Sequence, residues 1–232
     1  MERARVQLLR EVLSSTGWID RTRGFARSLR RSTEGTGELL LVGTPTEEPW
    51  HLAAHLDEEA RYADLQGLSP TLVRWAPPPD APAHLSVGLD RLVASGRGET
   101  VFVVAPDDPT EGLLERVADA RRAGATVLAL DVGDADLAGL AHDELIVPAS
   151  GLLAPGEHSG LTLPMGAAGL SDLDLSLPDV SFETVQHLVS AAAGEPDILL
   201  AAIAGSPVPK GLRDRLGRLL DTISGPRTPR DW

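Results

Sequence analysis

Residues 98–131, GETVFVVAPDDPTEGLLERVADARRAGATVLALD, have the pattern of a strand, a loop, a helix and a second strand. The apolar, β-branched and aromatic run at 100–104 is typical of a strand buried on both faces of a parallel sheet. Apolar residues then recur at helical spacing between Thr110, which is placed to cap a helix, and Gly124, which is placed to end it. Such a unit brings the loop at 105–110 to the carboxyl edge of the sheet, where α/β folds bind ligands.

Similar patterns occur on both sides of this unit. Buried runs predict further strands, and helical periodicity predicts the helices that separate them. The alternation predicts an α/β fold, a three-layer α/β/α sandwich with a mostly parallel five-stranded sheet. The further strands are expected at 38–42, 69–75 and 144–147, and the helices at 2–13, 18–31, 50–62, 85–94, 135–141 and 181–193.

The sequence divides into three parts. Residues 1–34 are expected to form an N-terminal helical pair, and 35–195 the α/β domain. Within that domain, 149–177 is rich in glycine and proline and is expected to be a loop-rich insertion, a lid or an interface segment. Residues 196–232 are expected to form a C-terminal helical extension.

The composition excludes several protein classes. The 232 residues carry a formal net charge of −13, which argues against a general nucleic-acid binder. No apolar run reaches the roughly 18 residues of a membrane span. The N-terminus lacks a signal-peptide layout, so we expect a cytoplasmic protein with no membrane partner. The chain has no cysteine, which excludes disulfides and thiolate metal sites; no cofactor and no metal are expected.

The charge is unevenly distributed along the chain. Residues 1–34 hold eight arginines and four acidic residues, so this end is basic while the remainder is strongly acidic. The basic end could contact an acidic partner or an acidic neighbouring subunit. The alternative is an arginine-rich helix face exposed to solvent.

Three stretches resemble the sugar isomerase (SIS) family of phosphosugar-binding domains. They are residues 98–104 (GETVFVV), 117–130 (VADARRAGATVLAL) and 137–148 (LAGLAHDELIVP), and the resemblance covers about 38–148. It implies a five-stranded parallel sheet flanked by helices, assembly as a homodimer or homotetramer, and a sugar or sugar phosphate as ligand. Members of the family isomerise, dehydrate or cleave phosphosugars, or bind them as regulators.

The loops that hold phosphate in that family differ here. Family members have a Ser/Thr-rich loop at the place of 105–110, where this chain keeps one hydroxyl group and gains two carboxylates. The first loop, 43–48, contains a proline, which lacks a backbone donor, and two glutamates. Both changes oppose a phosphate dianion at a helix N-terminus. The candidate ligand-binding residues are Gly43, Thr44, Thr46, Asp107, Asp108 and Thr110.

Two other roles are open for the aspartates of the second loop. Asp107 and Asp108 could cap the helix that begins at Thr110, which we expect to be their main role. They could also coordinate a hard cation together with Glu47 or Glu48. If they face the ligand cleft instead, they favour a cationic or neutral polyol ligand over a phosphate.

Acid/base candidates occur on two of the expected helices. In the family, the helix after the first loop often carries a catalytic glutamate near the place of His55, which could act as a base here. His51 and His55 are four residues apart, a spacing that can place two imidazoles on one metal, but no third ligand is identifiable. Glu183 and His187 form a similar pair, which is either exposed or, as in the family, reaches a neighbour's active site. The candidate catalytic residues are His55, Glu58, Glu59 and His187.

Three functions are compatible with these features. The first is a divergent SIS-fold protein, non-catalytic, that binds a carbohydrate derivative or acts as a regulatory or interaction module. The second is a phosphosugar isomerase or lyase/dehydratase that uses His55, Glu58 or Glu59 as acid/base and an arginine such as Arg61 or Arg74 as phosphate clamp. The third is a structural subunit that pairs with an active SIS enzyme through its basic helices.

Overall fold

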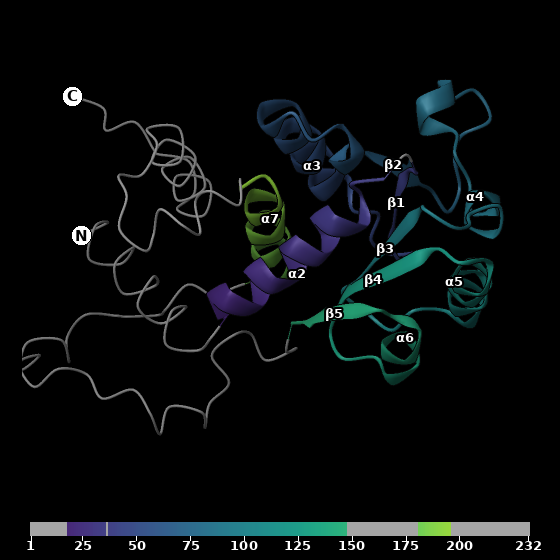
Figure 1. The fold of residues 1–232 in the computed structure, drawn as a ribbon. Coiled ribbons are helices and arrows are strands. Elements are labelled where there is room, and N and C mark those ends of the chain that lie inside the picture. The colour runs from purple at the N-terminus through teal and green to yellow at the C-terminus, as the bar shows by residue number, and fades with distance from the viewer. Residues whose placement is uncertain (1–17, 36, 148–180, 196–232) are drawn as a thin grey trace, which may run out of the picture.

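Five parallel strands form the central layer of the protein (Figure 1). The computed structural model describes residues 18–35, 37–147 and 181–195. The strands are β1 (Leu39–Val42), β2 (Pro70–Val73), β3 (Thr100–Ala105), β4 (Thr126–Asp131) and β5 (Asp143–Ile146). The helices are α2 (Trp18–Ser32), α3 (Trp50–Ala63), α4 (Asp90–Val93), α5 (Glu111–Ala123), α6 (Ala135–Leu140) and α7 (Phe182–Ala193), with short 3-10 turns at Gln66–Leu68 and Ala83–Leu85.

The strand order is β2-β1-β3-β4-β5, and every neighbouring pair is parallel. All residues of β3 and all but the first of β4 are buried. Such continuous burial is what a strand requires when helices cover both faces of the sheet, and it explains the unbroken apolar runs in the sequence. The predicted three-layer α/β fold is confirmed, and among the described strands the sheet is entirely parallel.

Alternate residues of each strand supply two separate cores. Phe102 and Val104 of β3 point to the face covered by α2, α3 and α7, whereas Val101 and Val103 point to the face covered by α4, α5 and α6 (Figure 1). On the first face, the ring of Phe25 from α2 packs 5.4 Å from the ring of Phe102. The helix predicted at 18–31 therefore forms part of the main core.

The central unit has the caps that its sequence predicts. The Thr110 side chain accepts a hydrogen bond of 3.4 Å from the Leu113 backbone N–H at the start of α5. Gly124 ends the helix with a φ of 101°, a left-handed conformation that glycine adopts without steric cost. Because Thr110 is the cap, the expectation that Asp107 and Asp108 cap this helix is wrong.

The helix expected at 85–94 is wrong over its first half. A 3-10 turn ends at Leu85, and α4 comprises only residues 90–93. Between them, the Val87 carbonyl accepts a hydrogen bond of 2.8 Å from the Arg74 backbone N–H, and Gly88 forms an isolated parallel bridge with Arg74. The chain is thus drawn into an extended pairing beside β2, which a helix cannot provide.

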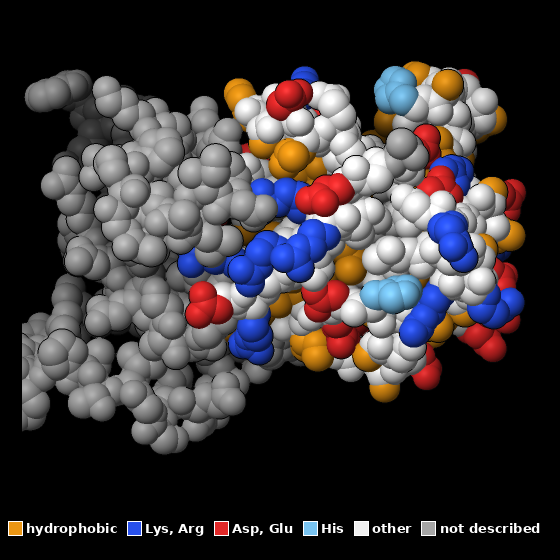
Figure 2. All heavy atoms as spheres, viewed as in Figure 1, with side chains coloured by type: hydrophobic (Ala, Val, Ile, Leu, Met, Phe, Trp, Pro, Cys, Tyr) orange, Lys and Arg blue, Asp and Glu red, His pale blue; other side chains and the backbone are white. Residues whose placement is uncertain are grey.

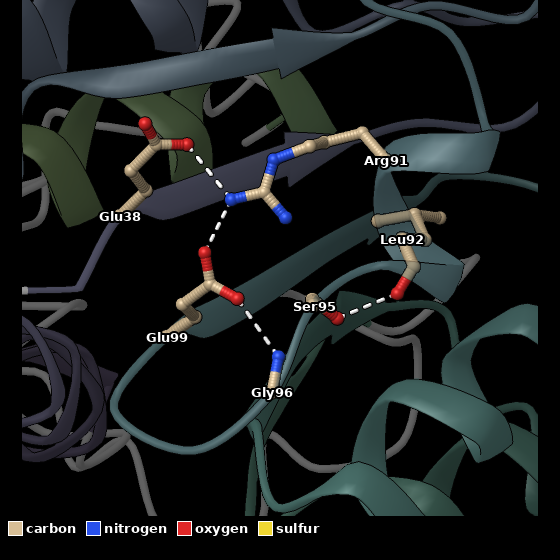
Figure 3. Close-up of polar contacts among 6 residues, drawn as sticks. All are labelled: Glu38, Arg91, Leu92, Ser95, Gly96 and Glu99. Carbon is tan, nitrogen blue, oxygen red and sulfur yellow. Dashed lines mark hydrogen bonds and ion pairs between the residues drawn. The ribbon is translucent and has the colours of Figure 1, made fainter.

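Ion pairs hold the amino edge of the sheet together. Arg91 of α4 bonds both Glu38, which precedes β1, and Glu99, which precedes β3 (Figure 3). The hydrogen bond with Glu99 raises the pKa of Arg91 above its usual value. Burial alone would raise the pKa of Glu99, but the bonds from Arg91 and from the Gly96 backbone N–H lower it below its usual value. The charged groups at the amino edge are thereby paired with one another within the chain, in contrast with the carboxyl edge.

Several expectations fall outside the described residues. These are the helix at 2–13, the loop-rich insertion at 149–177 and the C-terminal helical extension at 196–232. Of the helices that are described, none is long and apolar enough to cross a membrane.

Candidate functional site

The strand order reverses direction between β1 and β3. From β1 the chain first moves outward to β2 and then returns to the other side of β1 to form β3, β4 and β5. The loops after β1 and β3 therefore leave the sheet toward opposite faces, and the crevice expected at such a switch point lies between residues 43–48 and 105–110 at the carboxyl edge. Ligands of open α/β sheets bind at this position. The predicted binding residues occur in these two loops.

A chain of side-chain hydrogen bonds crosses this crevice. The Thr44 hydroxyl lies 3.0 Å from the Thr46 hydroxyl, and Thr46 in turn donates to the Asp107 carboxylate from the loop after β3. Thr44 is fully buried, whereas Thr46 is exposed at the rim. Three of the predicted ligand-binding residues, which are up to 63 positions apart in the sequence, are thus brought together.

The hydroxyl protons of Thr44 and Thr46 are already used in these hydrogen bonds. A threonine hydroxyl carries one proton, so Thr46, which gives its proton to Asp107, must accept the proton of Thr44. Pro45, between the two threonines, has no backbone N–H to offer. The second carboxylate oxygen of Asp107, Oδ1, is buried and has no hydrogen-bond partner among the described residues. The crevice therefore presents an unsatisfied acceptor and few donors.

Gly43 shapes the loop after β1. A Cβ atom at this position would lie 2.0 Å from the Glu47 carbonyl oxygen and 2.7 Å from the Pro49 ring, so a side chain cannot be accommodated without moving the backbone. The Gly43 carbonyl also accepts a hydrogen bond of 2.9 Å from the Trp75 indole N–H. Gly43 therefore allows the loop backbone to pack closely at this point, and it contributes no side chain to the site.

A second set of residues lines the rim of the same edge. Glu48 accepts hydrogen bonds from the Arg74 side chain at 3.0 Å, the Trp75 backbone N–H at 3.1 Å and the Trp50 indole at 3.0 Å. The Arg74 guanidinium lies over the Trp50 ring, 4.6 Å from its centroid. Because Glu48 is fully engaged, it does not join the aspartates of the other loop in a cation site.

The sequence gives a partial signal for this rim. Trp75 is the last residue of the strand predicted at 69–75, and Trp50 opens the helix after the first loop, in a chain with only 3% aromatic residues. Rare aromatic residues at two such positions could have been assigned to the site. Of the predicted phosphate clamps, Arg74 lies at this edge, but Arg61 pairs with Asp57 further along α3.

Two of the predicted binding residues take no part in the hydrogen-bonded chain. The Asp108 side chain is exposed, and no hydrogen bond or ion pair joins it to another described residue. The Thr110 hydroxyl is used as the cap of α5. The first-turn residue Glu111 also places a carboxylate at this helix N-terminus. An anion would therefore meet negative charge where the helix dipole would otherwise attract it.

The predicted catalytic residues lie on α3 and α7, two helices that pack against each other. His51 Nδ1 lies 3.0 Å from Glu183 Oε1, and His55 Nδ1 lies 3.9 Å from Glu58 Oε2. The rings of His55 and His187 meet edge to face, with centroids 4.6 Å apart. The two histidine-containing helices are thus brought together within one chain.

His187 differs from the other histidines of this cluster. Its Nε2 atom is buried and has no hydrogen-bond partner among the described residues. Burial and the neighbouring His55 lower the pKa of His187, and the effect of Glu183, which raises it, does not compensate. A neutral imidazole with one free nitrogen is an arrangement that can accept or shuttle a proton.

Glu59 is directed elsewhere on the α3–α7 interface. A Cβ atom added at Gly194, just past the end of α7, would lie 2.1 Å from a Glu59 carboxylate oxygen. Glu59 is therefore one turn beyond the histidine cluster. Within residues 18–35, 37–147 and 181–195, no group of three or more His, Asp or Glu side chains is arranged to hold a metal ion.

A pair of carboxyl groups that sequence analysis did not identify, Asp131 and the half-buried Glu144, lies between β4 and β5. Asp131 is fully buried, and its Oδ1 accepts a hydrogen bond of 2.9 Å from the Gly133 backbone N–H. Burial is the main cause that raises the pKa of Asp131 to about 7, with a further contribution from Glu144. Its position at the end of a buried strand was the only sequence signal.

The comparisons with known proteins give structural matches alone. No protein-family model matches the sequence, and no curated protein matches it. A protein described as sugar-binding, from Salmonella typhimurium LT2, is 17% identical with a TM-score of 0.49, over 95% of this chain and 56% of its own. A protein described as a phosphosugar isomerase, from Silicibacter pomeroyi DSS-3, is 18% identical with a TM-score of 0.47. The match covers 97% of this chain and 55% of that protein.

A third match is the sugar isomerase domain of the RpiR transcription factor from Sphaerobacter thermophilus. It is 14% identical with a TM-score of 0.44, over 94% of this chain and 98% of its own. The chain spans about half the length of the first two proteins. The strand order and register, rather than these scores, establish the α/β architecture, and in that architecture the chain is similar to proteins described as sugar-binding or sugar isomerase proteins.

Proposed function

We propose that this protein binds a carbohydrate derivative in the crevice between β1 and β3, through hydroxyl or amino groups of the ligand rather than through a phosphate. The observation that carries the proposal is the Asp107 carboxylate, which spans the crevice to Thr46 and leaves Oδ1 buried without a donor. A sugar hydroxyl or ammonium group would satisfy that acceptor. The residue resemblance to phosphosugar-binding domains supports a carbohydrate as the ligand class.

Charge is the reason for excluding a tight phosphate site. Two like charges 4 Å apart repel by about 4 kcal/mol at an intermediate dielectric constant of about 20. A phosphate in the crevice would meet Asp107, and the hydroxyls of Thr44 and Thr46 have no free proton to offset that repulsion. We therefore infer that the site acts as a binding or regulatory module.

A thermal-shift and calorimetry panel tests the proposal. It contains free hexoses, amino sugars and N-acetylated sugars, each beside its 6-phosphate. A ligand that binds only the folded state raises the melting temperature. We expect stabilisation by one or more free sugars, with a loss of affinity of tenfold or more in Asp107→Asn, because an amide oxygen is a weaker acceptor. Asp108→Asn, at the exposed neighbour, is the matched control and should bind as the wild type does. Absence of stabilisation by every free sugar would sink the proposal.

A second candidate function is favoured by the histidine cluster between α3 and α7. His187, with a lowered pKa and a free Nε2, lies against His55, so the pair could move a proton in a sugar isomerisation or lyase reaction. Turnover of a panel of aldose and ketose phosphates tests this function. It predicts activity that falls by 100-fold or more in His55→Ala or His187→Ala, whereas Glu59→Ala, outside the cluster, keeps most of it. Activity unaffected by both histidine substitutions would exclude this assignment.

The family resemblance is the basis for a proposed assembly, and the cytoplasmic location remains an expectation of the sequence. We propose a homodimer or homotetramer that works in the cytoplasm. Light scattering on the full chain tests the assembly, and a monomer at micromolar concentration would argue against it.

A further inference from the structure

Exposed hydrophobic side chains are scattered among charged ones on the face of the molecule shown in Figure 2. Among the described residues, the large hydrophobic side chains that are exposed are those of Trp50, Tyr62, Val93 and Ile146. Isolated exposed hydrophobic residues are common and need no explanation in themselves. Trp50 differs because of its place: it is the first residue of α3, two positions after the crevice loop at 43–48, and it is 39% exposed.

The Trp50 ring is held in one orientation by its neighbours. Its indole N–H donates a hydrogen bond of 3.0 Å to Glu48 Oε2, and the Arg74 guanidinium covers one ring face, 4.6 Å from the centroid. Glu48 in turn accepts hydrogen bonds from the Arg74 side chain at 3.0 Å and from the Trp75 backbone N–H at 3.1 Å. A ligand can therefore reach the ring from the face opposite Arg74. Because the ring is already ordered, stacking on it requires little further loss of side-chain entropy.

The charges around this ring cancel. Arg74 and Glu48 form an ion pair whose side chains are only 18% and 17% exposed, so the guanidinium is not free to hold an anion. What remains accessible is the aromatic face, which carries the negative part of the ring quadrupole. The group that complements it is a flat patch of C–H bonds made slightly positive by adjacent oxygen atoms, as on the face of a pyranose ring. A phosphate group has no such patch.

The same loop connects the Trp50 ring to the hydrogen-bonded chain of the crevice. The Trp75 indole N–H donates 2.9 Å to the carbonyl of Gly43, where this loop begins. Within the loop, the Glu47 backbone N–H donates 3.3 Å to the Thr44 carbonyl. One short loop thus carries, on one side, the threonines that reach Asp107 and, on the other, the glutamate that fixes Trp50.

We propose that Trp50 is a stacking residue of the carbohydrate site, with its free face packed against a pyranose ring of the ligand whose hydroxyl or amino groups bind Asp107. This inference rests on the proposed function and narrows its ligand class. A polyol that satisfies Asp107 is not sufficient; the ligand must also be a sugar in its ring form, with a face of C–H bonds.

Calorimetry on the full chain tests the inference. The probes are the free hexoses, amino sugars and N-acetylated sugars of the thermal-shift panel, each beside its alditol, the open-chain form made by reduction at the anomeric carbon. An alditol keeps the hydroxyl or amino groups but cannot form a flat ring face. We expect the wild type to prefer the ring form. In Trp50→Ala, the affinity for the ring form should fall by about three- to tenfold, while the affinity for the alditol stays constant.

Three further variants separate stacking from other effects. Trp50→Phe keeps an aromatic face but loses the N–H bonded to Glu48, so it should retain most of the preference for the ring form. Tyr62→Ala, at an exposed aromatic residue near the other end of α3, is the matched control and should bind as the wild type does. Asp107→Asn should weaken ring form and alditol alike. Circular dichroism and melting temperature verify that the variants are folded.

The outcomes distinguish this inference from the proposed function. Sugar binding that Asp107→Asn weakens and Trp50→Ala leaves unchanged would overturn the stacking role and leave the carbohydrate site intact. A preference for the ring form that is equal in the wild type and in Trp50→Ala would overturn it as well. Self-association that Trp50→Ala abolishes without a change in sugar affinity would assign the ring to a contact with a second copy of the chain. Absence of binding by every free sugar would overturn both proposals.

Discussion

Asp131 is the residue whose ionisation should most affect stability. Its pKa of about 7 in the folded protein lies above the value of 3.8 expected for an exposed carboxyl group. The native state therefore retains a proton that the unfolded chain has lost between these two values. Stability that is fully present below about pH 4 is lost as the pH rises to about 7, with a slope approaching 1.4 kcal/mol per pH unit.

The substitution Asp131→Asn tests this assignment. The amide keeps an acceptor for the Gly133 N–H and cannot ionise, so this variant should lose the downward slope and be more stable than the wild type at pH 8. Urea unfolding at pH 5, 6, 7 and 8 measures both effects. Asp136→Asn, at an exposed position in the first turn of α6, should keep the wild-type slope. Equal pH dependence of stability in the wild type and in Asp131→Asn would show that Asp131 is ionised throughout this range.

Thr110 allows a structural role to be separated from a binding role. Thr110→Ala removes the side-chain acceptor for the Leu113 N–H and should lower the free energy of unfolding by about 1 kcal/mol. Thr110→Ser should restore most of it, and neither change should alter sugar affinity. Denaturant unfolding measures the free energy of unfolding, and calorimetry measures the sugar affinity. A loss of affinity in Thr110→Ala without a loss of stability would show that Thr110 binds the ligand.

At the scale of elements, the loop between β1 and α3 determines the shape of the crevice. Gly43→Ala would bring a methyl group within 2.0 Å of the Glu47 carbonyl oxygen, so the loop must shift. We expect a loss of more than about 2 kcal/mol in the free energy of unfolding, in the range of severe single substitutions. Gly139→Ala is the control: a Cβ there contacts nothing within 4 Å, and alanine favours a helix, so it should stabilise α6 by up to about 1 kcal/mol. Equal stability of the two variants would contradict this role of the loop.

The elements themselves were predictable where the pattern is local. β1, β3 and β4 follow from continuous apolar runs, and the caps at Thr110 and Gly124 follow from residue type. The helix expected at 85–94 failed because the pairing of Arg74 with Val87 is a contact between segments, which periodicity cannot reveal.

The site was predictable only as a set of loops. Residues 43–46 and 107 could be assigned to the carboxyl edge from the strand–loop–helix pattern. That Thr46 donates to Asp107, 61 residues away, depends on the strand order, as does the contact of His51 with Glu183, 132 residues away. The carboxyl pair at β4 and β5 was missed because only the three-dimensional arrangement places Glu144 beside Asp131.

For the whole molecule, the two edges of the sheet differ in how their polar groups are satisfied. At the amino edge, Arg91 joins Glu38 and Glu99, and the charges are paired (Figure 3). At the carboxyl edge, the crevice between β1 and β3 has an unsatisfied acceptor on Asp107. Polar groups left without partners in a buried crevice are expensive unless a ligand or water completes them. The account therefore assigns ligand binding to the carboxyl edge and a structural role to the amino edge.

The most direct test of this account is the affinity ratio between a free sugar and its 6-phosphate, for example N-acetylglucosamine and N-acetylglucosamine 6-phosphate, measured by calorimetry on the wild type and on Asp107→Ser. The wild type should prefer the free sugar. Removal of the carboxylate should shift the ratio toward the phosphate by tenfold or more, equivalent to about 1.4 kcal/mol. Tighter binding of the phosphate by the wild type, with no change in Asp107→Ser, would contradict the account.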